Sequence, residues 1–190
     1  MSLEELYKEL SNITALRENR LKYANMVLED MSLFPKLMDI LFMVDDKVSC
    51  EAAWVLEFIC AEYLYAIVPY LNTFTSNLKK IHFDSAVRPV AKVCGFIATD
   101  YYSKKPNTLQ NTLSPIHKEF IVEACFDWLI SDHKVAPKVY SMEILYLFGK
   151  DSNWIHTELA LILEQDFSKQ SAGFKARAKQ TLKKIKKNKL

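Results

Sequence analysis

The chain has 190 residues, half of them hydrophobic and a quarter charged, which is the composition of a folded globular protein. It contains only three glycines, which argues against glycine-rich loops that bind nucleotide phosphates. The net charge of +2 conceals an asymmetry. Residues 1–166 carry 16 basic and 23 acidic side chains, whereas residues 167–190 carry nine basic and no acidic ones.

The first residues and the cysteines predict a soluble, cytoplasmic protein. The amino-terminal segment is acidic and amphipathic, unlike a signal peptide, and the longest apolar runs fall short of the roughly 18 residues that cross a bilayer. The cysteines all fall in apolar helical stretches without a C-x-x-C spacing, so we expect buried, reduced thiols. They are Cys50, Cys60, Cys94 and Cys125.

Helical patterns follow one another along the chain. Ser2 and Glu5 form a capping box that opens a short helix to about Leu10, and a second helix is expected at 15–29. Four helix pairs then follow, at 33–43 with 46–64, 67–81 with 85–104, 114–131 with 134–149, and 153–166 with 171–187. The polar segment 103–111 is expected to be an exposed loop, and no strand is predicted.

The second helix of each pair begins with a recurring pattern. The starting residues are Asp45, Asp84, Asp132 and Ser171, which lie 39, 48 and 39 residues apart. A period in this range is typical of stacked helix pairs that bury their apolar faces only against their neighbours. The leading Asp or Ser is expected to cap the second helix.

These second helices resemble those of HEAT repeats, whose pattern reads roughly D-x-x-V-R-x-x-A-A-x-A-L-x-x-I. Residues 45–59 read DDKVSCEAAWVLEFI, with Ser49 in place of the usual Arg, and the next copy keeps Val87, Arg88 and Ala91. The third copy is poorer, and the fourth has Lys175 in place of Arg. The resemblance covers about 33–187. It implies an all-α fold, namely a short HEAT-like α-α superhelix of about four to five helix pairs. Residues 1–190 would form a single domain, and 1–31 would provide its amino-terminal capping helices.

The sequence contains no constellation that predicts catalysis, a metal site or a cofactor. The four histidines lack metal-ligand spacing, and no G-x-S-x-G or comparable nucleophile motif is present. The signature loop of fumarase/aspartase-type lyases is also missing. We therefore expect a non-enzymatic protein without a cofactor.

The HEAT resemblance implies an inner, concave face lined by the seventh and tenth positions of each second helix. These positions are Glu51 and Trp54, Val90 and Val93, Lys138 and Ser141, and Arg177 and Gln180. The candidate partner-binding residues are taken from these positions and from Arg88 and Lys92 of the second copy; they are Glu51, Trp54, Arg88, Lys92, Lys138 and Arg177. Trp54 is either an exposed anchor for a partner or a residue packed against the amino-terminal helices.

Three functions remain open. The first is a scaffold that binds a protein partner on its concave face. The second is nucleic-acid binding, since the implied fold is similar to that of DNA-alkylation-repair glycosylases. The basic carboxyl-terminal helix, with Arg88, Lys92, Lys138 and Arg177, would then contact phosphates. The acidic body argues against this function, because a nucleic-acid groove needs a broad positive field. The third is head-to-tail self-association of the acidic body with the basic carboxyl-terminal helix, whose lysines otherwise keep a terminal repeat soluble.

Overall fold

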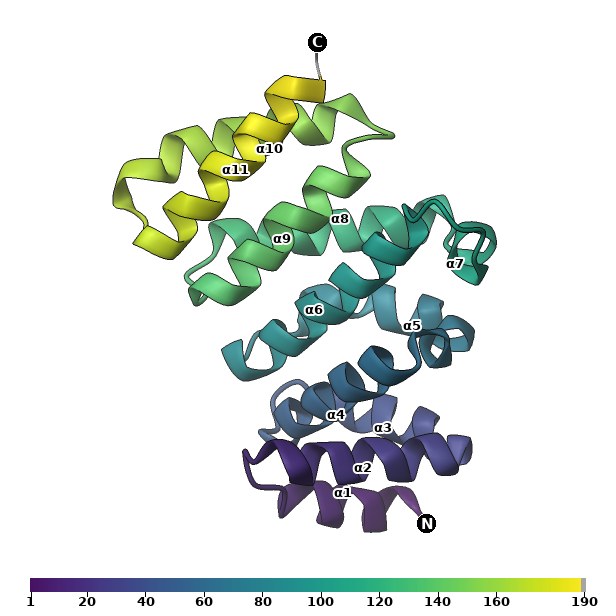
Figure 1. Ribbon diagram of the computed structural model, residues 1–190. Helices are drawn as coiled ribbons and strands as arrows, with labels where there is room; N and C mark the ends of the chain where they lie inside the picture. Colours follow the sequence, from purple (N-terminus) through teal and green to yellow (C-terminus); the bar gives the residue numbers. More distant parts are fainter. Residues whose placement is uncertain (189–190) are drawn as a thin grey trace.

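The computed structural model describes residues 1–188, which contain eleven α-helices and no strand (Figure 1). The all-α fold class is confirmed. The helices are α1 (Leu3–Ser11), α2 (Arg17–Glu29), α3 (Phe34–Leu41), α4 (Val48–Glu62), α5 (Leu71–Ser76), α6 (Asp84–Tyr101), α7 (Thr108–Thr112), α8 (Pro115–Ile130), α9 (Val135–Phe148), α10 (Asn153–Asp166) and α11 (Ala172–Asn188).

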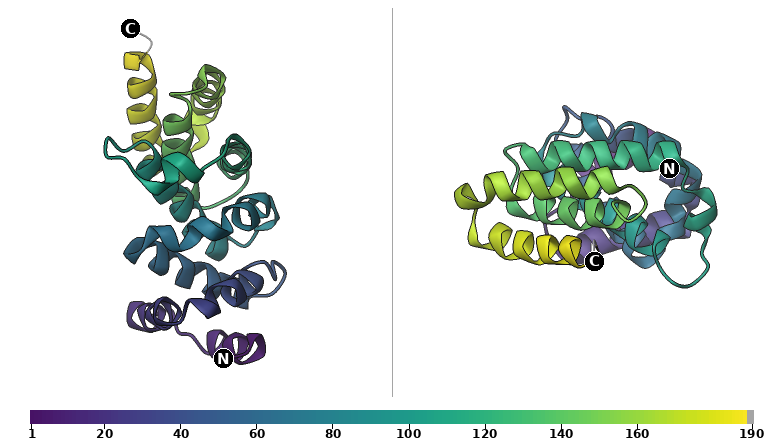
Figure 2. Two further views of the ribbon diagram at one scale, coloured as in Figure 1. Left: turned by 90° about the vertical axis from the view of Figure 1, so that its right-hand side faces the viewer. Right: turned by 90° about the horizontal axis from the view of Figure 1, so that it is seen from above.

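The helices form a two-layer stack with the chain termini at opposite ends (Figures 1 and 2). Helices α2, α4, α6, α9 and α11 make one layer, in which each helix packs against the next. Helices α1, α3, α5, α8 and α10 lie behind them in the other layer. We call the exposed surfaces of these two layers the second-helix face and the first-helix face.

Small side chains allow the second helices to pack closely. Ala52 and Ala53 of α4, and Ala91 and Ala98 of α6, are fully buried between neighbouring helices. The largest fully buried side chains are Phe34, Phe74, Phe148 and Phe174. This packing places one continuous core along the stack.

The four cysteines are free and buried in this core, as their sequence positions predicted. Burial raises the pKa of each thiol. A raised pKa keeps a thiol protonated and therefore a poor nucleophile. The cysteines are thus packing residues.

Two predicted segments differ from the structure. The helix expected at 67–81 is broken into a 3₁₀ segment (Leu64–Tyr70), the short α5 and a 3₁₀ turn (Leu78–Lys80). Pro69 lies inside the 3₁₀ segment and has no N–H, so Leu64–Ser76 cannot form one fully hydrogen-bonded α-helix. The loop expected at 103–111 contains the start of α7, which an Asn107 capping box opens and whose Leu109 is fully buried.

The predicted capping role of the repeat's first residue holds for Ser171 alone. The Phe174 N–H donates to the Ser171 hydroxyl at the start of α11. At the start of α4 the Val48 N–H donates to the Asp46 carboxylate, one residue after the repeat position, while the N-cap residue itself is Lys47. Asp84 is already the first residue of α6. The Asp84 carboxylate instead accepts from His133, at 2.7 Å, so it ties one inter-helix turn to the next.

No single helix within residues 1–188 is long and apolar enough to span a bilayer. One pair bent by 118°, α4 with the segment Leu64–Ser76, meets the length and composition criteria when its two parts are taken together.

Gly149 ends α9 where the His156 ring packs against the backbone. The His156 imidazole is buried, lies 2.8 Å from the Tyr146 carbonyl oxygen and stacks on the Tyr146 ring. A Cβ atom at position 149 would lie 2.0 Å from His156 Cδ2. The glycine is therefore required by close approach of a side chain, since its φ of −63° is open to any residue.

This contact predicts opposite effects for two Gly→Ala substitutions. Gly149→Ala should lower the free energy of unfolding by about 1–3 kcal/mol, because the His156 ring must move. Gly95→Ala, in the middle of α6 with nothing within 4 Å of the new Cβ, should raise it by about 0.5–1 kcal/mol through helix propensity. The free energies of unfolding of both variants are measured by urea denaturation. Equal changes of the same sign in the two variants would contradict the prediction.

Candidate binding face

A row of cations on aromatic rings crosses the amino-terminal half of the second-helix face. The Arg17 guanidinium of α2 lies 5.6 Å from the centre of the Phe58 ring of α4. Trp54, one turn before Phe58, contacts arginines on both neighbouring helices. Further along, the Lys92 ammonium lies 5.5 Å from the Phe96 ring centre on α6. The row therefore joins three successive second helices.

Trp54 lies at the centre of this row, held between two guanidinium groups. The Arg20 guanidinium carbon is 4.0 Å from the Trp54 ring centroid, and that of Arg88 is 4.5 Å from it. Both distances are within the range of favourable cation–π interaction. The indole is half-buried. It packs against the amino-terminal helix α2 through Arg20 and still reaches the surface.

The two arginines differ in their hydrogen bonding. Arg20 is 12% exposed and forms an ion pair with Glu51 at 3.4 Å. Arg88 is half-buried, and in residues 1–188 no oxygen accepts a hydrogen bond from its guanidinium. A guanidinium has five N–H donors in a fixed plane. Arg88 thus presents unused donors next to an aromatic surface.

Lys92 neutralises a buried carboxylate on the adjacent helix. Its ammonium pairs with Glu57 Oε1, and the Glu57 side chain is 6% exposed. The other oxygen, Oε2, is buried without a hydrogen-bond partner. Because an uncompensated buried charge is strongly unfavourable, Lys92 is held on Glu57 and is less available to a ligand than Arg88.

The carboxyl-terminal half of the face is more open. A hollow of about 170 Å³ between α6 and α9 is lined by Lys92, Gly95, Phe96, Thr99, Tyr140 and Glu143. Beyond it, the Lys184 ammonium of α11 lies 5.3 Å from the Tyr146 ring centre. The lysines of α11 that face outward, such as Lys183, are exposed, while Phe174, Ala178 and Ile185 are buried. Lys189 of the basic end lies outside the described residues.

The candidate residues from the sequence are only partly brought together. Glu51, Trp54, Arg88 and Lys92 lie side by side on α4 and α6. Arg177 is half-buried near the start of α11, at the far end of the stack.

The predicted inner-face register is wrong in α6 and α9. Lys138 is 7% exposed and Ser141 is fully buried, as are Val90 and Val93. The stripe of α9 that reaches solvent instead contains the exposed Glu143 and the half-buried Tyr140 and Tyr146. One residue changes direction by about 100° around a helix, so a small shift between the repeat's first residue and the helix start turns an expected surface position into the core.

Arg20 and Arg17 were missed by sequence reasoning. They belong to α2, which shows no copy of the repeat pattern and was interpreted as a capping helix. Their spacing of three residues places them on one side of a helix, which is the only signal that links them. Their contacts with Trp54 and Phe58 span more than 30 residues of sequence, and no local pattern encodes such a pairing.

Within the described range, no group of three or more His, Cys, Asp or Glu side chains could hold a metal ion. His117 is buried, and burial lowers its pKa. It caps α8 together with Ser114, and its Nε2 lies 2.5 Å from Asn72 Oδ1. His117 is thus engaged in structural hydrogen bonds.

The buried ion pair predicts a measurable stability difference. Lys92→Met should lower the free energy of unfolding by roughly 3 kcal/mol, because it leaves Glu57 charged and unpaired. Adding Glu57→Met should recover much of this loss, since it removes the buried charge. Chemical denaturation of both variants gives the values, with Lys104→Met at an exposed position as the control. A single-variant loss no greater than that of the control would show that the pair contributes nothing.

Comparison of the chain with protein-family models, with curated proteins and with solved structures gave no match. Function must therefore be argued from the helical stack and its surfaces.

Proposed function

We propose that this protein is a non-enzymatic, HEAT-like scaffold that binds a protein partner on its second-helix face. Two features support a HEAT-like interpretation: the 39-residue spacing of the second-helix pattern and the side-by-side packing of α4, α6 and α9. In HEAT-like stacks this layer forms the concave face. Repeat stacks of this kind offer an extended surface for a partner because neighbouring repeats contribute adjacent side chains.

The observation that carries this proposal is the Arg20–Trp54–Arg88 stack. Tryptophan and arginine are the residues most enriched at binding hot spots. Here the ring is fixed by Arg20 on one side, so little conformational entropy is lost when a partner contacts it. Arg88 adds open donors at the same place.

The free donors of Arg88 define the chemistry of the partner. A planar guanidinium binds a carboxylate through two parallel hydrogen bonds. The nearby acidic residues Glu51 and Glu57 are already paired with Arg20 and Lys92. An acidic side chain flanked by apolar residues would therefore pair with Arg88 while its neighbours pack on Trp54.

Nucleic-acid binding is the second candidate, because α11 presents a lysine-rich surface on the same layer. Lys183, Lys184 and Lys187 line a shallow hollow of about 270 Å³ on that helix. Phosphate contacts of this kind would produce a steep salt dependence. Against it, Glu51, Glu57 and Glu143 interrupt the positive charge along the face.

The protein-binding proposal predicts that Arg88→Gln abolishes partner capture. The immobilised full-length chain is compared with Arg88→Gln and with Lys104→Gln, a matched charge change on an exposed segment, and captured proteins are quantified by mass spectrometry. The captured amount of a direct partner should fall by about ten-fold or more with Arg88→Gln and stay unchanged with Lys104→Gln, as expected for a hot-spot residue. A captured set that is the same for all three chains would contradict the proposal, as would substrate turnover by the protein alone.

Fluorescence anisotropy with labelled duplex and single-stranded DNA tests the alternative. Nucleic-acid function would require binding that falls steeply with salt and is lost when Lys183, Lys184 and Lys187 are replaced by Glu. Because these side chains line the surface of α11, the substitutions leave its buried stripe intact. Absence of binding at low salt would remove the nucleic-acid candidate without affecting the protein-binding one.

A further inference from the structure

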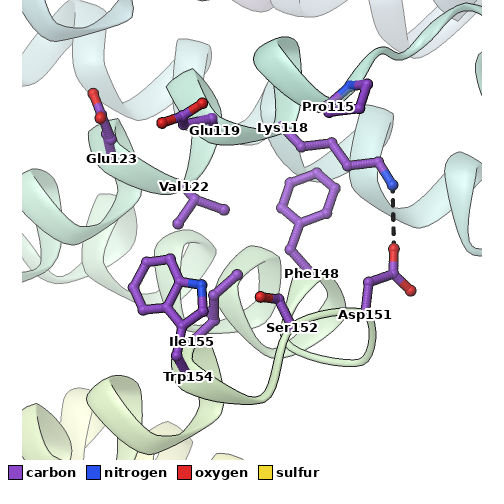
Figure 3. A pocket seen from close by; sticks show the side chains of 10 residues that line it. All are labelled: Pro115, Lys118, Glu119, Val122, Glu123, Phe148, Asp151, Ser152, Trp154 and Ile155. Carbon is purple, nitrogen blue, oxygen red and sulfur yellow. Dashed lines mark hydrogen bonds and ion pairs between the residues drawn. The ribbon is translucent and has the colours of Figure 1, made fainter.

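The first-helix face is opened by a groove of about 410 Å³ between α8 and α10 (Figure 3). Its apolar floor consists of Val122, Phe148 and Ile155. Glu119 and Glu123 border it on the α8 side and Trp154 borders it on the α10 side. Its volume is that of a site for a small ligand or for one or two side chains of a partner.

Trp154 is the most unusual residue of this groove. It is 59% exposed, whereas Trp128 is 3% exposed. Its ring stacks on Phe126, with centroids 5.8 Å apart, so the indole is fixed against α8 and not free in solvent. Ile116, Ile130 and Leu161 are also exposed on the same two helices, but none of them lines the groove. An exposed aromatic ring at the edge of an apolar groove is typical of a binding site.

The charges around the groove are unbalanced. The only lining cation, Lys118, is held at one end, where its ammonium lies 3.1 Å from Asp151 Oδ2 and 2.6 Å from the Tyr101 hydroxyl. Tyr102 also donates to Asp151, and burial, followed by this hydrogen bond, raises the pKa of Tyr102. Lys118 and Asp151 thus neutralise each other inside a fixed network.

Two carboxylates remain at the other end. Glu119 is exposed and has no ion-pair partner among residues 1–188. Glu123 lies 3.5 Å from Lys79, but that lysine is shared at the same distance with Asp127. The groove is therefore apolar at its floor, aromatic on one wall and negatively charged on the other.

We propose that this groove binds a basic segment of a partner protein by accepting the side chain of an arginine or lysine. The alkyl stem of such a side chain would pack on Val122 and Ile155. Its cation would lie against the Trp154 indole and pair with Glu119 and Glu123, which combines cation–π attraction with charge complementarity. This surface is on the opposite layer from Trp54, so the inference does not depend on the function proposed for the second-helix face.

The test is a ¹⁵N NMR titration of the full-length protein with n-butylguanidinium, which is the arginine side chain in isolation, and with its uncharged analogue n-butylurea. The three indole N–H signals report on Trp54, Trp128 and Trp154 separately. We expect n-butylguanidinium to shift the Trp154 signal and the backbone amides of the groove, and n-butylurea to bind at least about five-fold more weakly. Equal binding of the two compounds, or no shift at Trp154, would overturn the proposal.

Variants separate the two contributions. The double variant Glu119→Gln with Glu123→Gln should weaken the binding of n-butylguanidinium by about five-fold or more. Trp154→Ala should remove the saturable shift of the groove amides. The control is Glu29→Gln with Glu62→Gln, which changes the net charge equally at exposed positions elsewhere. Unchanged affinity in the groove variants, or equal loss in the control, would show that the cation binds by general charge alone.

A second copy of the chain is the competing occupant, because its basic carboxyl-terminal helix carries suitable lysines. The Trp154 signal is therefore followed at several protein concentrations without n-butylguanidinium. A shift that depends on protein concentration would assign the groove to self-association and would overturn the proposal that it binds a different protein. Signals that stay constant on dilution would support the proposal.

Discussion

The structure depends on the fact that no helix pair can bury its own apolar surface. Helices α4, α6 and α9 are each covered on both flanks by neighbours and from behind by the first-helix layer. Only a narrow stripe of each second helix therefore reaches solvent. Side chains on that stripe contact those of the next helix, which is why Trp54 meets arginines from both α2 and α6.

This constraint explains what could be predicted from the sequence. The periodic spacing of apolar residues locates the helices well, because each helix buries apolar side chains against both of its neighbours. For α10 the expected bounds are those of the structure. The segment before α6 is different because it consists of a 3₁₀ segment, the short α5 and a 3₁₀ turn. These short elements bury residues such as Ile67 and Leu78 without a single period. The core could be read from the sequence where the helices are regular.

The candidate face was less predictable because it depends on helix rotation and on contacts between repeats. Trp54 and Arg88 were identified from their repeat positions, but Lys138 was placed on the wrong side of α9. Asp45 lies three residues before α4 begins at Val48, whereas the equivalent Asp84 is the first residue of α6, so equivalent residues do not have equivalent orientations. Arg20 completes the stack from a helix that carries no repeat pattern, and only the folded chain brings it to Trp54.

The two proposed surfaces differ in charge for a structural reason. Around Trp54, the acidic side chains Glu51 and Glu57 are paired with Arg20 and Lys92 of neighbouring helices, and Arg88 keeps open donors. In the groove the reverse holds, because Lys118 is paired within the Asp151 network and Glu119 remains unpaired. Structural ion pairs thus neutralise acidic side chains around Trp54 and the basic side chain in the groove. Partners of opposite charge would then occupy opposite layers of the stack without competing, as expected for a scaffold that brings two proteins together.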